Sequence, residues 1–514
     1  MKKLSRISRF WPEALLFGLC VVLYGYNAAR FDLPLGYAGL YALMAEQVGA
    51  AHFAMPFQVP YYGPGGLPFA YPPLAAYLAA FLTQALNLPI LAYARFAPVF
   101  FGLLALATLY VLALRLLQSR PKAWVGVLLA ACFAPLYAAH LYAAGIMRGP
   151  AFVLMLVGLI FAWDALRAEA FSWRKSLLAG AFLGLAGLSH LSYAVFFGVS
   201  ALAFALADFS FTAGWRKLAA LCVMAAVGVL VAAPWWLVVL SRHGPAVFTS
   251  ASQTHGTLGL VARANAGLVS FANLLSQHFF NFGKDWSPDI LPGLVVLGLG
   301  LALARRKWLL PLWFMACFLF IGERDRFLGL VAVLLVADLL VDLTQAWPSR
   351  PSPDRRAAWL AWLPVLLVLA FCYRSALKLV AAERPVLSQP VVAAGAWLQG
   401  NTPQDAVFLF AGGSHDLAEW LPYLAQRTPA VGLWGAEWTG AYARQSALSV
   451  QLSDCAERQA FDGCVNRLIQ DEELHPGYLI IPTGLEQLRV EIEAASDWQL
   501  AFENDALAVF ANIP

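Results

Sequence analysis

Long apolar runs separated by short polar loops occupy most of the chain up to about residue 380. Most of these runs approach or exceed about 18 residues, the length that an α-helix needs to cross the apolar core of a bilayer. We place about eleven such segments near residues 11–29, 91–116, 123–142, 149–166, 177–190, 192–208, 218–240, 291–304, 308–322, 327–345 and 359–379. The pattern predicts an α-helical polytopic membrane protein.

Basic residues gather in five of the loops between these segments. Lys and Arg in short loops mark the cytoplasmic side of a membrane protein. The basic loops cover residues 115–122, 167–175, 216–217, 305–307 and 350–356. Because the spans then fall in pairs after a first one, we expect a cytoplasmic N-terminus and an extracytoplasmic C-terminus, in a bacterial or archaeal plasma membrane.

One further apolar run, residues 72–88, is not counted among the spans. It opens with Pro-Pro, carries polar Thr83, Gln84 and Asn87 near its end, and is only about 16 residues long. A crossing helix here would invert every later basic loop. The run therefore favours a helix lying in the membrane interface on the outer side.

The threading predicts two domains. Residues 1–382 form a transmembrane domain with large extracytoplasmic loops at 30–88 and 241–290, and residues 383–514 form a soluble extracytoplasmic α/β domain. The first loop holds the Pro- and Gly-rich run 56–73, which is incompatible with regular helix. The tail contains charges, Pro breaks and short strand-like runs at 407–410, 478–481 and 506–510.

Composition agrees with a membrane protein and limits the partners. Of the 514 residues, 61% are apolar and 12% are charged, whereas soluble domains carry about 25% charged residues. The net charge of +4 is spread over the loops, so nothing predicts a nucleic acid partner. The lipid bilayer is the expected one.

Cysteine usage follows the predicted topology. Five cysteines lie in or beside predicted spans, where they act as small apolar side chains. Cys455 and Cys464 lie in the tail, and we expect a disulfide there because the tail should face an oxidising compartment. A bridge over so short a loop would contribute about 2–3 kcal/mol. The alternative is two unpaired thiols.

An ordered set of short motifs resembles the GT-C superfamily of polytopic glycosyltransferases, particularly the protein O-mannosyltransferases and the lipid A aminoarabinose transferases. The resemblance covers about residues 11–380. Its motifs are Leu43-Met44-Ala45-Glu46, Phe69-Ala70-Tyr71-Pro72-Pro73-Leu74, Tyr93-Ala94-Arg95-Phe96-Ala97-Pro98, Tyr110-Val111-Leu112-Ala113-Leu114-Arg115, Ala233-Pro234-Trp235-Trp236 and Glu323-Arg324-Asp325-Arg326.

The resemblance implies an enzyme that moves a hexosyl or pentosyl group from a polyprenyl-phosphate donor to a glycan, lipid or protein acceptor on the outer face, with inversion. Such a reaction needs a carboxylate as general base and cations for the departing phosphate. It implies no tightly bound cofactor beyond the donor substrate, and it leaves a divalent metal open.

Two carboxylates are candidates for the base. The family usually carries an acidic pair just before the Tyr of its first outer helix, where this chain has Tyr37 and Ala38. Asp32 and Glu46 are the nearest carboxylates on either side. Asp32 is the first candidate; its alternative role is to be solvated or to cap the following helix. Glu46 is the second, and is otherwise a solvated or ion-paired side chain.

Cationic side chains are the candidates for binding the donor phosphate. Arg324 and Arg326 end a span on the predicted outer side, where a guanidinium fork matches phosphate oxygens; the alternative is a local ion-pair set at the interface. The family's Leu-Asp-Pro motif appears here as Arg148-Gly149-Pro150, and Arg148 is expected to add to this basic pocket. His190 stands where aminoarabinose transferases have a Lys, although a lone His is more often a satisfied interface residue.

Three further residues complete the expected substrate-binding set: Tyr71, His243 and His255. The histidine spacings match no metal-ligand motif, so we predict no tightly held structural metal. The tail aromatics Trp420, Trp434, Trp438 and Tyr442 fit either a sugar-stacking surface or packing of the tail.

Two other functions stay open. The altered acidic motifs favour a non-catalytic relative that binds glycan or lipid or serves as an assembly subunit. A lipid-linked glycan transporter would need charged residues within several spans, whereas Asp164, Asp338 and Asp342 all lie near predicted inner ends.

Overall fold

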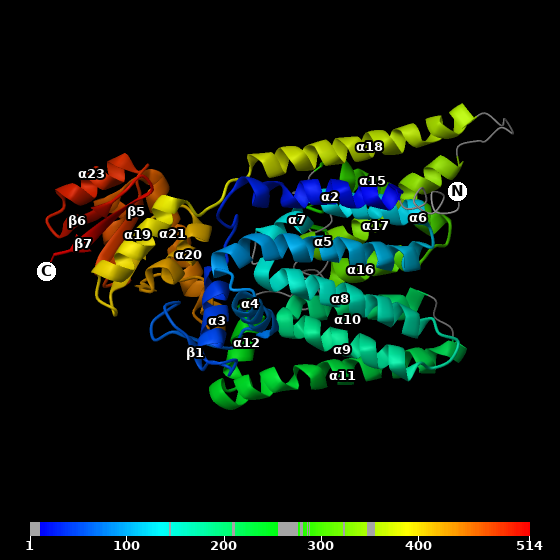
Figure 1. The fold of residues 1–514 in the computed structure, drawn as a ribbon, viewed down its shortest axis with the longest axis horizontal. Helices are drawn as coiled ribbons and strands as arrows, with labels where there is room; N and C mark the ends of the chain where they lie inside the picture. Colours follow the sequence, from blue (N-terminus) through cyan, green and yellow to red (C-terminus); the bar gives the residue numbers. More distant parts are fainter. Residues whose placement is uncertain are drawn as a thin grey trace. The chain divides into compact units, whose positions relative to one another are not determined.

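The computed structural model describes residues 11–142, 145–207, 211–254, 276–277, 281–284, 286, 288–321, 324–346 and 355–513. The chain divides into two compact units (Figure 1). The first takes its residues from 1–30, 97–235 and 256–383, and the second from 31–96, 236–255 and 384–514. The second unit therefore joins the first predicted outer loop, part of the second one and the tail, three stretches that are far apart in the sequence.

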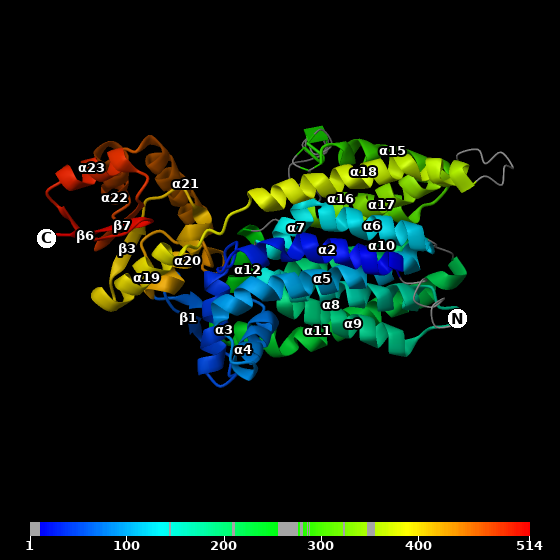
Figure 2. The same cartoon turned by 45° about the horizontal axis from the view of Figure 1, so that its top comes forward.

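The first unit is a bundle of helices that run side by side in both views (Figures 1 and 2). A described helix or helix pair coincides with each predicted apolar segment, and α5 and α11 also contribute to the second unit. The helices are α2 (Trp11–Arg30), α5 (Ile90–Leu117), α6 (Arg120–Cys132), α7 (Ala134–Leu141), α8 (Gly145–Leu166), α9 (Trp173–Ser189), α10 (Leu191–Ala207), α11 (Phe211–His243), α15 (Ile290–Ala304), α16 (Leu309–Phe320), α17 (Arg324–Ala346) and α18 (Arg355–Ala382).

Six of the described helices are long and apolar enough to cross a membrane: α2, α5, α8, α11, α17 and α18. A seventh span results if α6 and α7 are counted together, although they are bent by 63°. The bend falls at Phe133, whose backbone is extended. Pro135, in the first turn of α7, has no N–H to donate to a carbonyl of the preceding turn, so one continuous helix cannot form there. Shorter apolar helices, among them α10, α15 and α16, complete the bundle.

Helix α17 is the most enclosed of these long helices, with 89% of its apolar stretch buried inside the protein. Small residues let its neighbours approach closely, as is common between membrane helices. A Cβ on Gly126 of α6 would lie 3.0 Å from a methyl group of Leu334, and one on Gly298 of α15 would lie 3.1 Å from Leu335. A side chain at Gly329 would collide with the ring of Phe133. Helix α17 thus forms the centre on which the bundle packs.

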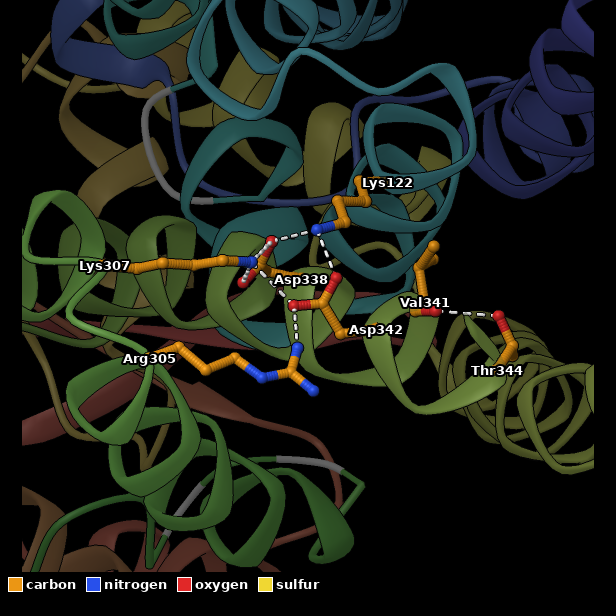
Figure 3. A network of polar contacts seen from close by, with 7 residues as sticks. All are labelled: Lys122, Arg305, Lys307, Asp338, Val341, Asp342 and Thr344. Carbon is orange, nitrogen blue, oxygen red and sulfur yellow. Dashed lines mark hydrogen bonds and ion pairs between the residues drawn. The ribbon is translucent and has the colours of Figure 1, made fainter. Parts of the chain in front are cut away.

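A network of five charged side chains holds one end of α17 to its neighbours (Figure 3). Asp338 and Asp342 lie one turn apart on α17. Lys122 of α6 reaches both carboxylates, each at 2.5 Å, and Lys307 reaches them from the opposite side at 3.2 and 2.6 Å. Arg305 binds Asp342 at 2.5 Å. The carboxylates are nearly buried and shared by three cations, so the network joins α6, α17 and the turn between α15 and α16.

Removing Lys122 tests this network. The Lys122 side chain is 9% exposed, and deleting it takes the most buried cation from two nearly buried carboxylates and leaves them to the more exposed Lys307 and Arg305. We expect Lys122→Met to reduce the free energy of unfolding in detergent by about 3 kcal/mol. The control is Arg115→Met, which removes an exposed pair with Asp164 and should cost under about 1 kcal/mol. Equal losses in the two variants would show that the network contributes no more than a surface ion pair.

The second unit contains a mixed five-stranded sheet with the order β4-β3-β5-β7-β6. Strand β3 (Val407–Phe410) pairs in parallel with β4 (Thr428–Pro429) and β5 (Tyr478–Pro482). Strand β7 (Leu507–Asn512) runs antiparallel to β5 and to β6 (Trp498–Glu503). The predicted runs at 407–410, 478–481 and 506–510 correspond to β3, β5 and β7. The edge strands β4 and β6 were not predicted from the sequence.

Helices and a short hairpin complete the second unit. From the tail come α19 (Gln389–Asn401), α20 (His415–Ala425), α21 (Tyr442–Arg458), α22 (Arg467–Asp471), α23 (Glu486–Ala494), the 3-10 turn η1 (Ala436–Trp438) and the π-helical turn η2 (Phe461–Asn466). The other stretches supply α3 (Gly39–Ala50), the hairpin β1 (Gln58–Val59) and β2 (Leu67–Pro68), α4 (Leu74–Ala85) and α12 (Ala246–Thr254).

A disulfide joins Cys455 of α21 to Cys464 of η2, with their Cα atoms 5.5 Å apart. Both lie beside the apolar core that Leu409, Leu479 and Phe510 form under the sheet. The other five cysteines are unpaired.

Candidate functional site

Buried polar side chains gather in the first unit where α7 ends, α10 begins and α17 begins. His140, Ser192, Tyr193, His190 and Arg326 are each 9% exposed or less. Polar groups inside an apolar bundle cost free energy unless they are hydrogen-bonded. Their bonds therefore show how the sequence positions them.

His140 is held in one tautomer. Its Nδ1 lies 2.7 Å from the carbonyl oxygen of Leu136, to which it donates. Its Nε2 is then an acceptor, and the Tyr193 hydroxyl donates to it at 2.6 Å. The ring of Phe152 stacks on the imidazole at 4.3 Å between centroids. Helices α7, α8 and α10 thus fix a neutral imidazole inside the bundle.

Arg326 is held by a serine and by two aromatic rings. Its Nη2 donates to the Ser192 hydroxyl at 3.0 Å, and that hydroxyl lies 2.8 Å from Nδ1 of His190. The guanidinium carbon lies 4.9 Å from the ring centroid of Phe327 and 5.5 Å from that of Tyr193. The aromatic rings and the serine orient the guanidinium, as a preorganised anion site requires.

Arg148, in the first turn of α8, adds a second guanidinium near these groups. The charges of both Arg326 and Arg148 act on the imidazole of His140. We call Arg148, Arg326, His140 and His190 the basic cluster. Both ring nitrogens of His140 are engaged, so the groups that suit a phosphate are the two guanidiniums and the imidazole of His190.

The structure brings together three residues expected at the donor phosphate: Arg148, His190 and Arg326. His190 lies between α9 and α10, at the tight turn where it was expected. The backbone of Arg324 begins α17, and His255 lies outside the described residues. His140 and Tyr193 were not among the predicted residues, although an ionisable residue within a predicted span was itself an indication.

The two candidate bases lie in the second unit in different surroundings. The Asp32 side chain is 92% exposed, and its Oδ1 accepts from the Arg95 guanidinium at 3.4 Å. It does not cap α3, whose N-cap position is Ala38. Glu46, on α3, accepts a hydrogen bond from the Tyr423 hydroxyl at 2.9 Å. Asp32 therefore stays accessible to solvent, while a phenol occupies one oxygen of Glu46.

Aromatic side chains from the first outer loop and the tail contact each other in the second unit. The ring centroid of Tyr71 lies 5.3 Å from that of Tyr41 and 5.8 Å from that of Trp438, and both pairs are edge to face. The ring centroids of Tyr37 and Trp434 are 4.3 Å apart. The indole N–H of Trp438 is buried and has no hydrogen-bond partner within the described part of the chain. We call these five rings the aromatic cluster.

His243, at the end of α11, belongs to the same unit but contacts other residues. Its ring lies 4.8 Å from that of Phe57. The neighbouring Arg242 donates to the carbonyl oxygen of Met55 at 2.9 Å. These contacts fasten the end of α11 to the first outer loop. No group of three or more metal-ligating residues occurs in the described ranges.

A buried carboxylate of the tail caps the first outer helix. Glu419 of α20 accepts hydrogen bonds from the backbone N–H of Gly39 at 2.8 Å and of Leu40 at 2.6 Å. These N–H groups are among the free donors at the start of α3, where a negative charge is also favoured. A Cβ at Gly39 would come within 2.7 Å of the Tyr62 hydroxyl. The close approach therefore depends on glycine.

Burial raises the pKa of Glu419 to about 8. The N–H groups of Leu40 and Gly39 lower the pKa, but by less than burial raises it, and the nearby Asp416 raises it further. Trp420 strengthens the same contact, since its indole N–H donates to the Gly36 carbonyl oxygen at 2.9 Å. Trp420 is fully buried, so it packs the tail and does not present a sugar-stacking face.

Solved structures resemble this chain, although no protein-family model and no curated protein sequence matches it. The structure of ArnT from Cupriavidus metallidurans bound to undecaprenyl phosphate has a TM-score of 0.57 and 15% identity, over 97% of this chain and 98% of that one. The archaeal oligosaccharyltransferase AglB from Archaeoglobus fulgidus, in complex with an inhibitory peptide and a dolichol-phosphate, has a TM-score of 0.57 and 14% identity over 93% and 70%.

The arabinofuranosyltransferase AftD from mycobacteria aligns with a TM-score of 0.52 and 14% identity, over 98% of this chain and 40% of its own. These proteins are GT-C membrane glycosyltransferases, and the similarity extends across nearly the full chain. At such identities it is a similarity of fold. The protein is thus a mostly helical, polytopic membrane protein with a GT-C-like fold and a small mixed sheet in its tail.

The Glu419 contact should respond to pH. Between pH 4.5 and 8 the unfolded carboxyl group loses its proton and the buried one keeps it, so opening of the contact becomes more favourable as pH rises. We expect the protection of the peptide covering residues 36–44 against hydrogen exchange, corrected for the intrinsic pH dependence, to fall over this range and level off above pH 8. In Glu419→Gln this pH dependence should disappear. A wild-type protection independent of pH would contradict the shifted pKa.

Proposed function

We propose that the protein is a membrane glycosyltransferase that moves a sugar from a polyprenyl-phosphate donor to an acceptor on the extracytoplasmic face, with inversion at the anomeric carbon. The basic cluster is the observation that carries this proposal. Its residues come from four helix ends of the first unit, and its chemistry is that of a phosphate site. The polyprenyl phosphates in the ArnT and AglB structures support the donor class.

The basic cluster would act on the leaving group. When the bond between the anomeric carbon and the phosphate oxygen breaks, negative charge develops on the phosphate. Arg326, oriented by Ser192 and two rings, donates to the phosphate oxygens, and Arg148 adds a second positive charge. The imidazole of His190, whose Nδ1 is engaged by Ser192, is proposed as a further donor to the same phosphate. Arg324 is proposed for this site as well.

Asp32 is proposed as the general base. It would take the proton of the acceptor hydroxyl as the oxygen attacks the face of the sugar opposite the phosphate, which gives inversion. Its exposure leaves it accessible to an acceptor. Glu46 is the second choice because the Tyr423 hydroxyl already occupies one of its oxygens.

The second unit would bind the acceptor, which is a glycan, a lipid or a protein. Tyr71 and Trp438 supply rings that suit a sugar face, and the buried indole N–H of Trp438 supplies a donor. His243 and His255 are proposed at its border. The accompanying topology has about eleven spans, a cytoplasmic N-terminus and an extracytoplasmic domain at 383–514.

A non-catalytic role in glycan or lipid binding, or as an assembly subunit, is the second candidate. Tyr37 stands at one position of the family's acidic pair, and its ring packs on Trp434. That position thus contributes to packing and not to chemistry. A transporter gains no comparable support, because Asp338 and Asp342 are both occupied in the ion network.

Replacing Arg326 tests the phosphate site. We expect Arg326→Met to weaken binding of undecaprenyl phosphate by about tenfold or more, because a charge-assisted hydrogen bond contributes about 1.5–3 kcal/mol. Arg374→Met, at an exposed position of α18, is the matched control and should bind like wild type. The measurement is a titration of purified protein with the lipid. Unchanged affinity in Arg326→Met would remove this residue from the site.

Replacing Asp32 separates the enzyme from the binding subunit. In an assay that supplies polyprenyl-phosphate sugar, Asp32→Asn should lower kcat by at least about 100-fold, as general bases contribute 10²–10⁴-fold. It should leave the affinity for undecaprenyl phosphate unchanged. Glu46→Gln is the companion variant, and normal kcat in Asp32→Asn with loss in Glu46→Gln would transfer the role. A wild-type protein that binds the lipid without turnover would favour the second candidate.

A further inference from the structure

A cavity of about 420 Å³ lies in the first unit between α2, α5, α6 and α18. One part of its wall is polar and is formed by Glu13, Tyr110 and Arg120. The rest is apolar and includes Trp124, Leu366 and Leu369. The volume falls within the range of small-molecule sites. None of these residues belongs to the basic cluster or the aromatic cluster.

The two carboxylate oxygens of Glu13 differ in their hydrogen bonds. Its Oε1 accepts from the Tyr110 hydroxyl at 2.8 Å and from Nε of Arg120 at 3.1 Å, and Nη2 of Arg120 donates to it as well. Its Oε2 is buried and has no hydrogen-bond partner in the described ranges. The backbone N–H of Glu13 itself also donates towards the carboxylate, and the charge of Arg120 acts on it. A buried carboxylate oxygen without a donor costs free energy that a ligand with an N–H group would recover.

The apolar wall reaches the surface of the bundle. Leu366, on α18, is 47% exposed, whereas Leu369 is nearly buried. The indole N–H of Trp124 donates to the Pro12 carbonyl oxygen at 2.8 Å, which fixes its ring against the cavity. Trp residues near the ends of spans are typical of the membrane interface. The cavity therefore has a charged part, which suits a lipid headgroup, and an apolar part, which suits an acyl chain.

We propose that this cavity binds a glycerophospholipid with a primary ammonium headgroup, such as phosphatidylethanolamine. The ammonium group donates to Oε2 of Glu13, the phosphate lies against Arg120, which is 48% exposed, and part of one acyl chain covers Trp124 and Leu369. A choline headgroup has no N–H to donate. A glycerol headgroup has hydroxyls but no positive charge to offset the carboxylate. Both should bind more weakly.

The experiment uses full-length protein, delipidated in detergent and titrated by native mass spectrometry with dioleoyl lipids. Phosphatidylethanolamine should bind about tenfold or more tightly than phosphatidylcholine and phosphatidylglycerol, because it adds a charge-assisted hydrogen bond. Equal affinities for the ethanolamine and choline lipids in the wild type would overturn the proposal.

Two variants and a control locate the binding. Glu13→Gln should lose the preference for the ethanolamine lipid, and its retention would also overturn the proposal. Val365, on α18, also lines the apolar part of the cavity, and Val365→Phe should fill that part and weaken binding of all three lipids by a similar factor. Glu169→Gln, which changes an exposed carboxylate between α8 and α9, should keep the wild-type preference.

Discussion

A bundle of apolar helices offers buried charges no water, so each buried charge has to find its partner within the protein. The arrangement of the first unit follows from this requirement. Asp338 and Asp342 on the central helix α17 bind Lys122, Arg305 and Lys307, and so fix α6 and the turn between α15 and α16. Near the start of the same helix, Arg326 binds Ser192. At one end of α17 the two carboxylates are thereby neutralised, while at the other end Arg326 carries a positive charge that a ligand anion can complement.

The same requirement explains why the second unit combines stretches that are far apart in the sequence. The free N–H groups at the start of α3 have no side-chain cap from their own segment. Glu419, about 380 residues further along the chain, supplies the acceptors. The cost of burying this carboxylate appears as its raised pKa. The tail is thus joined to the first outer loop by buried hydrogen bonds, and the aromatic cluster and Tyr423 extend that contact.

The sequence predicted the elements better than the site. Apolar runs located the helices of the bundle because length and hydrophobicity decide where a span forms. The edge strand β6 escaped notice because most of its side chains are exposed, which leaves no apolar run. Pro135 is a local signal for the break at Phe133, although residues 123–142 were predicted as one segment. Arg326 and His190 were expected at a phosphate, but the Ser192 hydroxyl that joins them follows from packing. The capping role of Glu419 could not be predicted, since no local pattern reveals a partner so distant in sequence.

The basic cluster is central to the proposed function, because the negative charge that develops on the departing phosphate has to be stabilised there. Its most direct test is an electron cryo-microscopy structure of the protein incubated with undecaprenyl phosphate. The expected result is density for the phosphate within about 3 Å of the guanidinium of Arg326. Phosphate density elsewhere on the protein, with Arg326 still bound to Ser192 and no density beside its guanidinium, would contradict the proposal.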